Sequence, residues 1–175
     1  SDVYKRQIHW CERLLMHMTI LINKKLSLNI LNHNYKEISP ELESRLELLA
    51  EHILVDQNEH ELKVNLKLIS SKEMIRLNGD FRAKDIDTNV LSFPAEKEFQ
   101  KISGELGDIA ISMPFIQNES QSLNRGLDDH MMHLLAHGIL HLLGFDHHKD
   151  NDANRMEAQE IKYLEFFKIA NPYLI

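Results

Sequence analysis

The hydrophobic pattern predicts strands in four stretches of the chain. Apolar and polar residues alternate strictly over 62–68, which is the pattern of a half-buried strand. Residues 89–93 and 106–112 are short apolar-rich runs that predict two more strands, and Pro94 stops the first of them. Residues 19–31 are apolar and β-prone, and they predict one or two further strands.

Helical periodicity lies between these strands. A Ser-Pro-Glu sequence at 39–41 has the features of a helix start: a serine N-cap, proline at the first helical position and an acid in the first turn. From Leu42 on, apolar residues recur at i, i+4, i+7 and i+11, which is one helical face. A short helix is predicted to begin at Ser70 or Ser71 and to end at Asn78-Gly79.

The remaining stretches complete the predicted fold. Residues 80–88 and 96–104 are predicted to be polar or charged loops, and three more helices are expected at about 114–122, 127–143 and 150–170. Strands and helices are therefore mixed along the chain, with helices in its C-terminal third. This order predicts a single α+β domain, a small mixed sheet with helices packed on it.

Composition narrows the class of protein. Lys plus Arg number 20 against 27 Asp plus Glu, so the net charge of −7 disfavours a protein that binds nucleic acid through global positive charge. The single Cys excludes an internal disulfide and a Cys-rich zinc site, and a reducing cytoplasmic location fits best. No apolar run approaches the ~20 residues that a bilayer needs. We expect 1–17 to be a non-native or unstructured extension and 18–175 to form the single domain.

Histidine is the residue type that stands out, with 11 in the chain. His130, His133, His137 and His141 fall within an arc of about 80° on the helix predicted over 127–143, beside its apolar stripe. A histidine stripe at the border of a core indicates a cleft. Metal binding, proton chemistry and chance all remain open at this level.

The spacing of His137, His141 and His147 is more specific. Two histidines at i and i+4 project side by side, and Gly144 suits a left-handed helix end after which the chain reverses. His147 can then return as a third ligand, although His148 and Asp146 compete for that place. The pattern H-x-x-x-H-x-x-G-x-x-H predicts a metal site with three imidazoles and an open position, on this helix and the turn that follows it. The other interpretation is three separate histidines, one in the core and two on the surface.

Two neighbouring positions qualify this interpretation. Zinc peptidases carry a glutamate directly after the first histidine as their general base, whereas this chain has Gly138 there. Proteolysis by the usual route therefore lacks its base, while attack on a phosphodiester by a metal-activated water stays possible. His133, one turn before His137, is either a group that supports the site or binds substrate, or a partly exposed helix histidine.

The histidine motif at 137–147 resembles the signature of the YbeY family, bacterial metal-dependent endoribonucleases that act in ribosomal RNA maturation. Residues 77–94 resemble the family's loop and strand before the metal site, and 107–112 resemble its following strand. The resemblance extends from about Met18 to the C-terminus. It implies one zinc ion per chain on three histidine ligands, cleavage of single-stranded RNA, and a role at the 3′ end of small-subunit ribosomal RNA and in ribosome quality control. The implied ligands are His137, His141 and His147.

The resemblance also carries candidate catalytic residues. Arg82 is a permanently charged fork suited to a phosphate, with a surface ion pair as its other interpretation. Alternation puts Asp108 on the strand face opposite Ile109, where it would orient a water or a histidine, or simply cap the strand. Ser92 is a weaker candidate. The family often has Asp at the position of Asn89, so any metal-binding role there is in doubt, whereas a turn-capping role would suit Asn equally well.

The expected partners are single-stranded or ribosomal RNA and the small ribosomal subunit or its proteins, with no DNA and no membrane. Several lysines and arginines predicted to border the site would follow a phosphate backbone: Lys72, Arg76, Arg82, Lys84, Lys97 and Lys101. Two alternatives remain open. One is a zinc peptidase or amidohydrolase with a base from elsewhere, and the other is a non-enzymatic ribosome-assembly factor with a structural metal.

Overall fold

A four-stranded mixed sheet forms the centre of the computed structural model, which describes residues 26–31 and 38–174. The strands are β1 (Leu28–Leu31), β2 (Lys63–Ile69), β3 (Val90–Pro94) and β4 (Glu105–Ser112). They lie in the order β1-β2-β4-β3. The first three strands in this order are parallel, and β3 runs antiparallel to β4 at one edge of the sheet.

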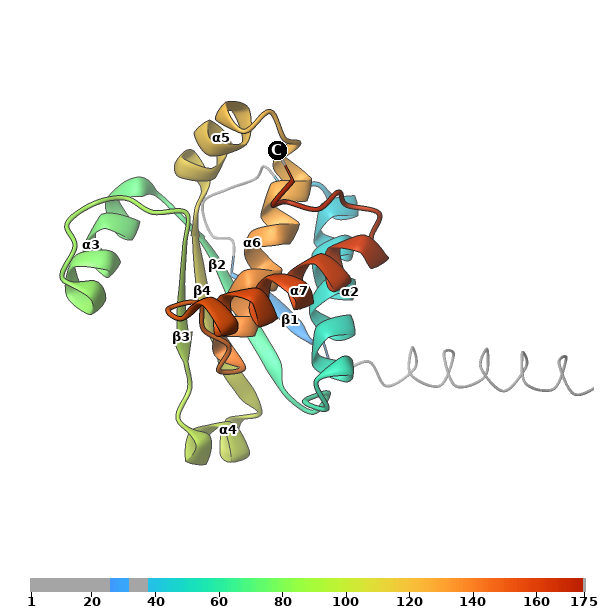
Figure 1. Ribbon diagram of the computed structural model, residues 1–175. Helices are drawn as coiled ribbons and strands as arrows, with labels where there is room; N and C mark the ends of the chain where they lie inside the picture. The colour runs from blue at the N-terminus through green and yellow to red at the C-terminus, as the bar shows by residue number, and fades with distance from the viewer. Residues whose placement is uncertain (1–25, 32–37, 175) are drawn as a thin grey trace, which may run out of the picture.

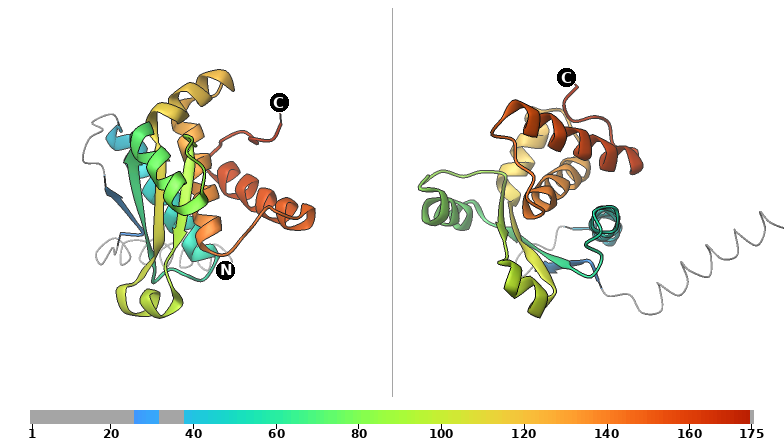
Figure 2. Two further views of the ribbon diagram at one scale, coloured as in Figure 1. Left: turned by 90° about the vertical axis from the view of Figure 1, so that its left-hand side faces the viewer. Right: turned by 60° about the horizontal axis from the view of Figure 1, so that its bottom comes forward.

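Helices cover both faces of this sheet (Figures 1 and 2). In the described ranges they are α2 (Pro40–Asp56), α3 (Ser71–Arg82), α4 (Lys97–Ser103), α5 (Met113–Ser122), α6 (Leu127–Leu142) and α7 (Asp150–Phe166). Helices α2 and α6 lie on one face with α7 packed against α6, and α3 lies on the opposite face. The predicted α+β domain, a small mixed sheet with helices packed on it, is confirmed.

The larger hydrophobic core lies between the sheet, α2 and α6. Leu66 of β2 and Ile109 and Ile111 of β4 point into it and are almost completely buried. Helix α6 is apolar around most of its surface because the sheet, α2, α5 and α7 all contact it. Burial on several sides fixes the helix that carries the histidine stripe.

A smaller cluster lies on the opposite face, between the sheet and α3. It contains Ile69, Met74, Leu91 and Ala110, with Phe93 packed against it. Because Ala110 belongs to this cluster while Ile109 and Ile111 belong to the larger core, β4 alternates as its sequence predicted.

Helix α3 is longer than the sequence predicted. It continues through Asn78-Gly79 and ends at Arg82, where Ala83 adopts a left-handed conformation and donates its N–H to the Asn78 and Gly79 carbonyls. Glycine fits inside this helix because a Cβ at position 79 would lie 2.4 Å from a carboxylate oxygen of Asp85. The predicted start of the polar loop at residue 80 is therefore wrong, and Arg82 lies in the last helical turn.

The predicted loop over 96–104 is also wrong, because it contains α4. The buried Gln100 side chain donates hydrogen bonds to the carbonyls of Ala95 and Leu106, which fixes the helix against the ends of β3 and β4. Gly104, with φ of 70°, then ends the helix. These contacts join residues on both sides of α4, so the local charge pattern does not reveal them.

Two predictions lie outside the described residues: the extension over 1–17 and the part of the first strand region over 19–25. Within the ranges that the structure does describe, no helix is both long enough and apolar enough to span a membrane.

Candidate metal centre

The three histidines of the motif converge at the end of α6. His137 and His141 lie one turn apart on the helix, and His147 follows the turn after it. Gly144, with φ of 91°, donates its N–H to the His141 carbonyl, and Phe145 donates its N–H to the Leu140 carbonyl. This Schellman geometry reverses the chain, as the glycine predicted. One ligand atom from each histidine lies within 4.8 Å of the other two.

The hydrogen bonds of His137 and His141 set which ring nitrogen is free. Nδ1 of His137 lies 2.7 Å from a Glu160 carboxylate oxygen, and Nδ1 of His141 lies 3.0 Å from the Phe145 carbonyl oxygen. Both partners accept, so each neutral ring donates from Nδ1 and keeps a lone pair on Nε2. These two Nε2 atoms are 3.0 Å apart. Two facing lone pairs repel unless a cation lies between them.

The pKa of His141 supports its neutral form. Burial, followed by repulsion from His137, lowers the pKa of His141 to about 4, although the hydrogen bond to Phe145 works in the opposite direction. The ring is therefore uncharged at neutral pH, which is the form that binds a metal ion.

Glu160 is the residue that orients His137, and it comes from α7. Its carboxylate is fully buried and accepts hydrogen bonds from His133, His137 and Tyr173. Burial would raise the pKa of Glu160, but these three hydrogen bonds outweigh it and lower the pKa to about 2. Three hydrogen bonds thus stabilise the buried negative charge, and that charge faces the outer nitrogen of His137.

These features fit a divalent transition metal. Ligand atoms about 2.1 Å from a tetrahedral ion lie roughly 3.4 Å apart, close to the 3.0 Å between the Nε2 atoms of His137 and His141. A carboxylate hydrogen-bonded to the outer nitrogen of a ligating histidine is the usual support of such a site. The side chain of His147 is exposed, so the third ligand approaches from the solvent side.

A cavity of about 670 Å³ opens over the three histidines. Arg82 and Lys84 line it from the end of α3 and the chain that follows, and Ser92 lines it from β3. The Ser92 hydroxyl donates a hydrogen bond to the Gly138 carbonyl, 3.2 Å away, so β3 and α6 are joined at the cavity wall. The structure thus brings Arg82 to the same cavity as the histidine triad.

Asp108 is not brought to this cavity. Its exposed side chain lies on the sheet face opposite α6 and accepts a hydrogen bond of 2.9 Å from the Asn65 amide. Ile109, its neighbour, takes the face toward α6, where it lies against Gly138. The structure therefore does not bring Asp108 together with the histidine triad.

The structure also distinguishes between the alternatives for the third ligand and for Asn89. His148 and Asp146 line the cavity, but His147 is the residue that groups with His137 and His141. Asn89 uses its side-chain oxygen to accept from the Val90 N–H and its amide nitrogen to donate to the Glu119 carboxylate. An aspartate there would face Glu119 with a like charge, so asparagine suits this capping role.

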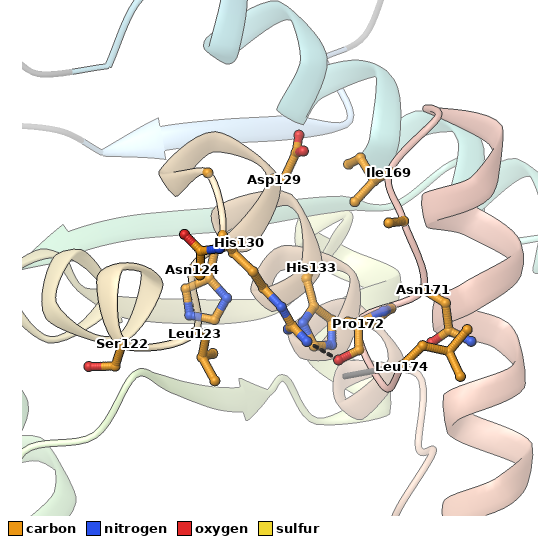
Figure 3. A pocket seen from close by; sticks show the side chains of 13 residues that line it. Ser122, Leu123, Asn124, Asp129, His130, His133, Ile169, Asn171, Pro172 and Leu174 are labelled. Atoms are coloured by element: carbon orange, nitrogen blue, oxygen red, sulfur yellow. Dashed lines mark hydrogen bonds between the residues drawn. The ribbon is translucent and has the colours of Figure 1, made fainter.

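A second cavity of about 480 Å³ lies farther along α6, beneath the C-terminal segment (Figure 3). His130 and His133 line its α6 side. Arg125 also lines it and donates a hydrogen bond to the Pro172 carbonyl. The next residue, Tyr173, donates its hydroxyl to Glu160. The C-terminal segment is thereby linked to the carboxylate that orients His137.

Comparison with known proteins matches the sequence of this chain to one family. The model of the endoribonuclease YbeY family matches residues 29–168. The chain belongs to the YbeY family. An endoribonuclease YbeY of Francisella tularensis subsp. tularensis (strain SCHU S4 / Schu 4) is 37% identical over 164 residues, which cover 87% of this chain and 95% of that protein. That of Francisella philomiragia subsp. philomiragia is 38% identical over 155 residues, covering 85% and 96%.

A solved structure shares the fold of this chain. The solution structure of TM1509 from Thermotoga maritima aligns with a TM-score of 0.56 at 28% identity, over 79% of this chain and 87% of that one. The family resemblance expected from the motifs is therefore confirmed, and with it a nuclease of the hydrolase class that acts on RNA.

The sequence did carry a signal for Glu160. On α7 the buried residues are Met156, Glu160, Tyr163 and Leu164. Their spacing of i, i+4, i+7 and i+8 is a single apolar stripe in which one position is a carboxylate. An acid inside a buried stripe needs partners of its own, which marks it as a candidate for a polar site.

Proposed function

We propose that this YbeY family member is a zinc-dependent, single-strand-specific endoribonuclease that acts in the cytoplasm. Its proposed task is maturation of the 3′ end of small-subunit ribosomal RNA and ribosome quality control, with the small ribosomal subunit or its proteins as partner. The observation that carries the proposal is the convergence of the three-histidine group and Arg82 on one cavity.

The metal part of the proposal rests on the donor set. His137, His141 and His147 would hold one zinc ion, since three neutral imidazoles leave a coordination position open. Zinc bound in this way supplies a Lewis acid and lowers the pKa of water for attack on a phosphodiester. Glu160 and the Phe145 carbonyl hold the first two rings in the tautomer that presents Nε2.

The RNA part rests on the cationic wall of the cavity. Arg82 offers a planar fork that can bind two phosphate oxygens at once, and Lys84 adds a second positive charge on the same wall. Arg82 would hold the phosphate next to the triad and stabilise the charge that builds up on it during cleavage. Binding through few cations predicts weak affinity for free RNA, which favours delivery of the substrate by the ribosome.

A peptidase is disfavoured by the same geometry. At Gly138, where zinc peptidases have their glutamate, an added Cβ would lie 2.8 Å from a side-chain carbon of Ile109. Glu160 does not replace it, because it binds Nδ1 of His137 on the side away from the neighbouring Nε2 atoms. A purely structural metal is disfavoured by the exposed third histidine and the open cavity above it.

One experiment separates these functions. Zinc-loaded protein is incubated with one labelled sequence as single-stranded RNA, as duplex RNA and as single-stranded DNA, and with a mixture of peptides. The proposal expects cleavage of the single-stranded RNA and loss of that cleavage when a chelator is added. Peptide hydrolysis would support the peptidase instead, and an absence of any cleavage by zinc-loaded protein would support the assembly factor.

The ribosomal role needs its own test. Cells that lack the protein should accumulate small-subunit RNA with an unprocessed 3′ end, and wild-type protein should restore the mature end. An Arg82→Ala protein should restore it poorly while still cosedimenting with small subunits. A mature 3′ end in the deletion strain would contradict this part of the proposal.

A further inference from the structure

The cavity over the histidines lies along the open edge of the sheet. Strand β3 comes last in the order β1-β2-β4-β3, so only one of its sides is paired. Helix α6 packs on one face of the sheet and α3 on the other, and residues of both helices line the cavity. A cavity with walls from both faces of a sheet runs along the edge that joins them. Residues 88–92 line it too, so the outer edge of β3 faces the same space as the histidine triad.

The register of β3 against β4 shows which main-chain groups point outward. Ser112 donates its N–H to the Asn89 carbonyl, and Ala95 donates its N–H to the Leu106 carbonyl. The antiparallel pairing between these two hydrogen bonds is regular. In such a ladder every second residue bonds to the partner strand. The alternation leaves the main-chain groups of the intervening residues on the open edge: Val90, Ser92 and Pro94.

Two of these outward positions cannot donate a hydrogen bond to a ligand. The Val90 N–H already donates to the side-chain oxygen of Asn89, 2.8 Å away, and Pro94 has no N–H. The side chain of Ser92 is turned toward α6, where its hydroxyl donates to the Gly138 carbonyl. Within the described part of β3, the main-chain N–H of Ser92 is therefore the one donor that the edge offers to the cavity.

An added peptide strand is a poor occupant of this edge. Such a strand bonds to a sheet through donors and acceptors that alternate along the edge, whereas two of the three outward positions of β3 can only accept. An anion needs donors alone. Arg82 and Lys84 line the same cavity, and phosphate oxygens form their strongest hydrogen bonds with cationic donors. The charge of the cavity wall thus favours a phosphate oxygen as the partner of the Ser92 N–H.

We infer that the main-chain N–H of Ser92 binds a non-bridging oxygen of the RNA phosphate that is held over the histidine triad. The inference rests on the proposed function, because this is the phosphate that Arg82 would bind. A main-chain N–H fixed in a sheet is already oriented, so it stabilises negative charge on the phosphate without reorganisation. Arg82 lines the cavity from the end of α3 and Ser92 lines it from the strand, so the two donors would hold the phosphate from different elements.

A pair of substitutions tests the N–H. Ser92→Pro removes the N–H together with the hydroxyl, and Ser92→Ala removes the hydroxyl alone, so the ratio of their cleavage rates reports on the N–H. Pro94 shows that proline fits an outward position of this strand. With equal zinc content, Ser92→Pro should cleave single-stranded RNA roughly ten- to hundred-fold more slowly than Ser92→Ala.

A second variant tests the same group without proline. The amide between Leu91 and Ser92 is replaced by an ester, which removes the N–H, keeps the serine side chain and adds no atom to the cavity. This protein should bind one zinc ion per chain and cleave the RNA roughly ten- to hundred-fold more slowly than wild-type. An ester at Glu98 is the matched control. Glu98 lies in the first turn of α4, where an N–H has no intrahelical partner, and it does not line the cavity.

Modified substrates identify the oxygen. Sulfur is a weaker hydrogen-bond acceptor than oxygen, so RNAs that carry sulfur in place of one or the other non-bridging oxygen at the cleaved phosphate are compared. One of the two should be cleaved more slowly than normal RNA by wild-type protein, but as fast as normal RNA by the protein with the ester at Ser92. Such non-additivity is the mark of two groups in direct contact.

A wild-type rate for the ester at Ser92 would overturn the inference even if Ser92→Pro is slow, because proline also places ring carbons at the edge. A slow ester protein that stays sensitive to both sulfur substitutions would overturn it too, because the N–H would then bind a base or a sugar. If wild-type protein cleaves no RNA at all, the proposed function itself fails. Cleavage by wild-type without an effect of the ester rejects only the Ser92 contact.

Discussion

Nδ1 of His137 lies 2.7 Å from a carboxylate oxygen of Glu160, a fully buried residue 23 positions later in the chain. The contact joins α6 to α7 and fixes the ring so that its Nε2 faces the same point as Nε2 of His141. One buried carboxylate therefore connects the packing of the C-terminal helix to the geometry of the metal centre.

Replacement of Glu160 by glutamine should lower the affinity of the protein for the metal ion. Glu160→Gln keeps the size of the side chain but removes the negative charge that His137 faces. Loss of such a partner of a ligating histidine typically costs 10- to 100-fold in metal affinity. Competition with a chromogenic chelator measures this affinity, and Glu165→Gln, exposed on the same helix, is the control. Equal affinities for the two variants would mean that Glu160 only fills space.

His141→Ala should abolish stoichiometric zinc, because it removes one of the three converging ligands. His147→Ala should do the same, whereas His148→Ala, whose side chain is 80% exposed, should keep one zinc ion per chain. Elemental analysis of the purified proteins gives the zinc content directly. Full metal retention by His147→Ala together with loss in His148→Ala would move the third ligand to His148.

Arg82→Ala should slow RNA cleavage while zinc content and melting temperature stay at their wild-type values. A charge-assisted contact to phosphate is worth about 1.5–3 kcal/mol, or roughly ten- to hundred-fold in rate if it is made in the transition state. Arg76→Ala is the matched control, since Arg76 is exposed on the same helix and does not line the cavity. Rates that are the same for both variants would show that Arg82 is only a surface charge.

Acid should destabilise the folded protein in two steps. The pKa of His141 is about 4 when folded and 6.5 in its ordinary range, so the unfolded chain binds more protons between these values. This contribution to stability is present above pH 6.5 and is lost as the pH falls toward 4. The pKa of Glu160 is lowered from 4.5 to about 2 in the folded protein. Its contribution to stability is therefore lost in a second step, as the pH falls from about 4.5 toward 2.

Bound zinc should steepen the first step, because its histidine ligands must be neutral. The melting temperature of zinc-loaded protein should therefore fall more between about pH 7.5 and 5 than that of chelator-treated protein. Thermal unfolding followed by circular dichroism at each pH measures the melting temperatures of the two samples. Parallel curves would show that metal binding is not linked to proton uptake, and would argue against three histidine ligands.

The triad was predictable because its geometry is local. His137 and His141 are one turn apart on a helix whose apolar pattern is clear. Gly144 indicates the chain reversal that brings His147 close to them. The strands were predictable for the same reason, since alternation over 106–112 needs no information from elsewhere in the chain.

Contacts between distant segments were not predictable in this way. Alternation predicts that Asp108 and Ile109 lie on opposite faces of β4, but it does not predict which face packs against α6. The structure shows that Ile109 lies on the α6 face and Asp108 on the other. The end of α3 likewise involves the hydrogen bond from the Asn78 side chain to the Ile86 carbonyl, which joins the helix to the loop that follows it. The hydrogen bond between His137 and Glu160 depends on how α7 packs against α6. An acid among the buried positions of α7 indicates a polar site but does not identify its partner.

We propose that zinc on the histidine triad makes this protein an RNA-cleaving enzyme. The most direct measurement titrates zinc into metal-stripped wild-type and His141→Ala proteins and records the rate at which each cleaves single-stranded RNA. We expect a wild-type rate that rises linearly up to one zinc ion per chain and then stays constant, and no rise in the variant. Cleavage without zinc, or an equal response of His141→Ala, would contradict this role of the triad.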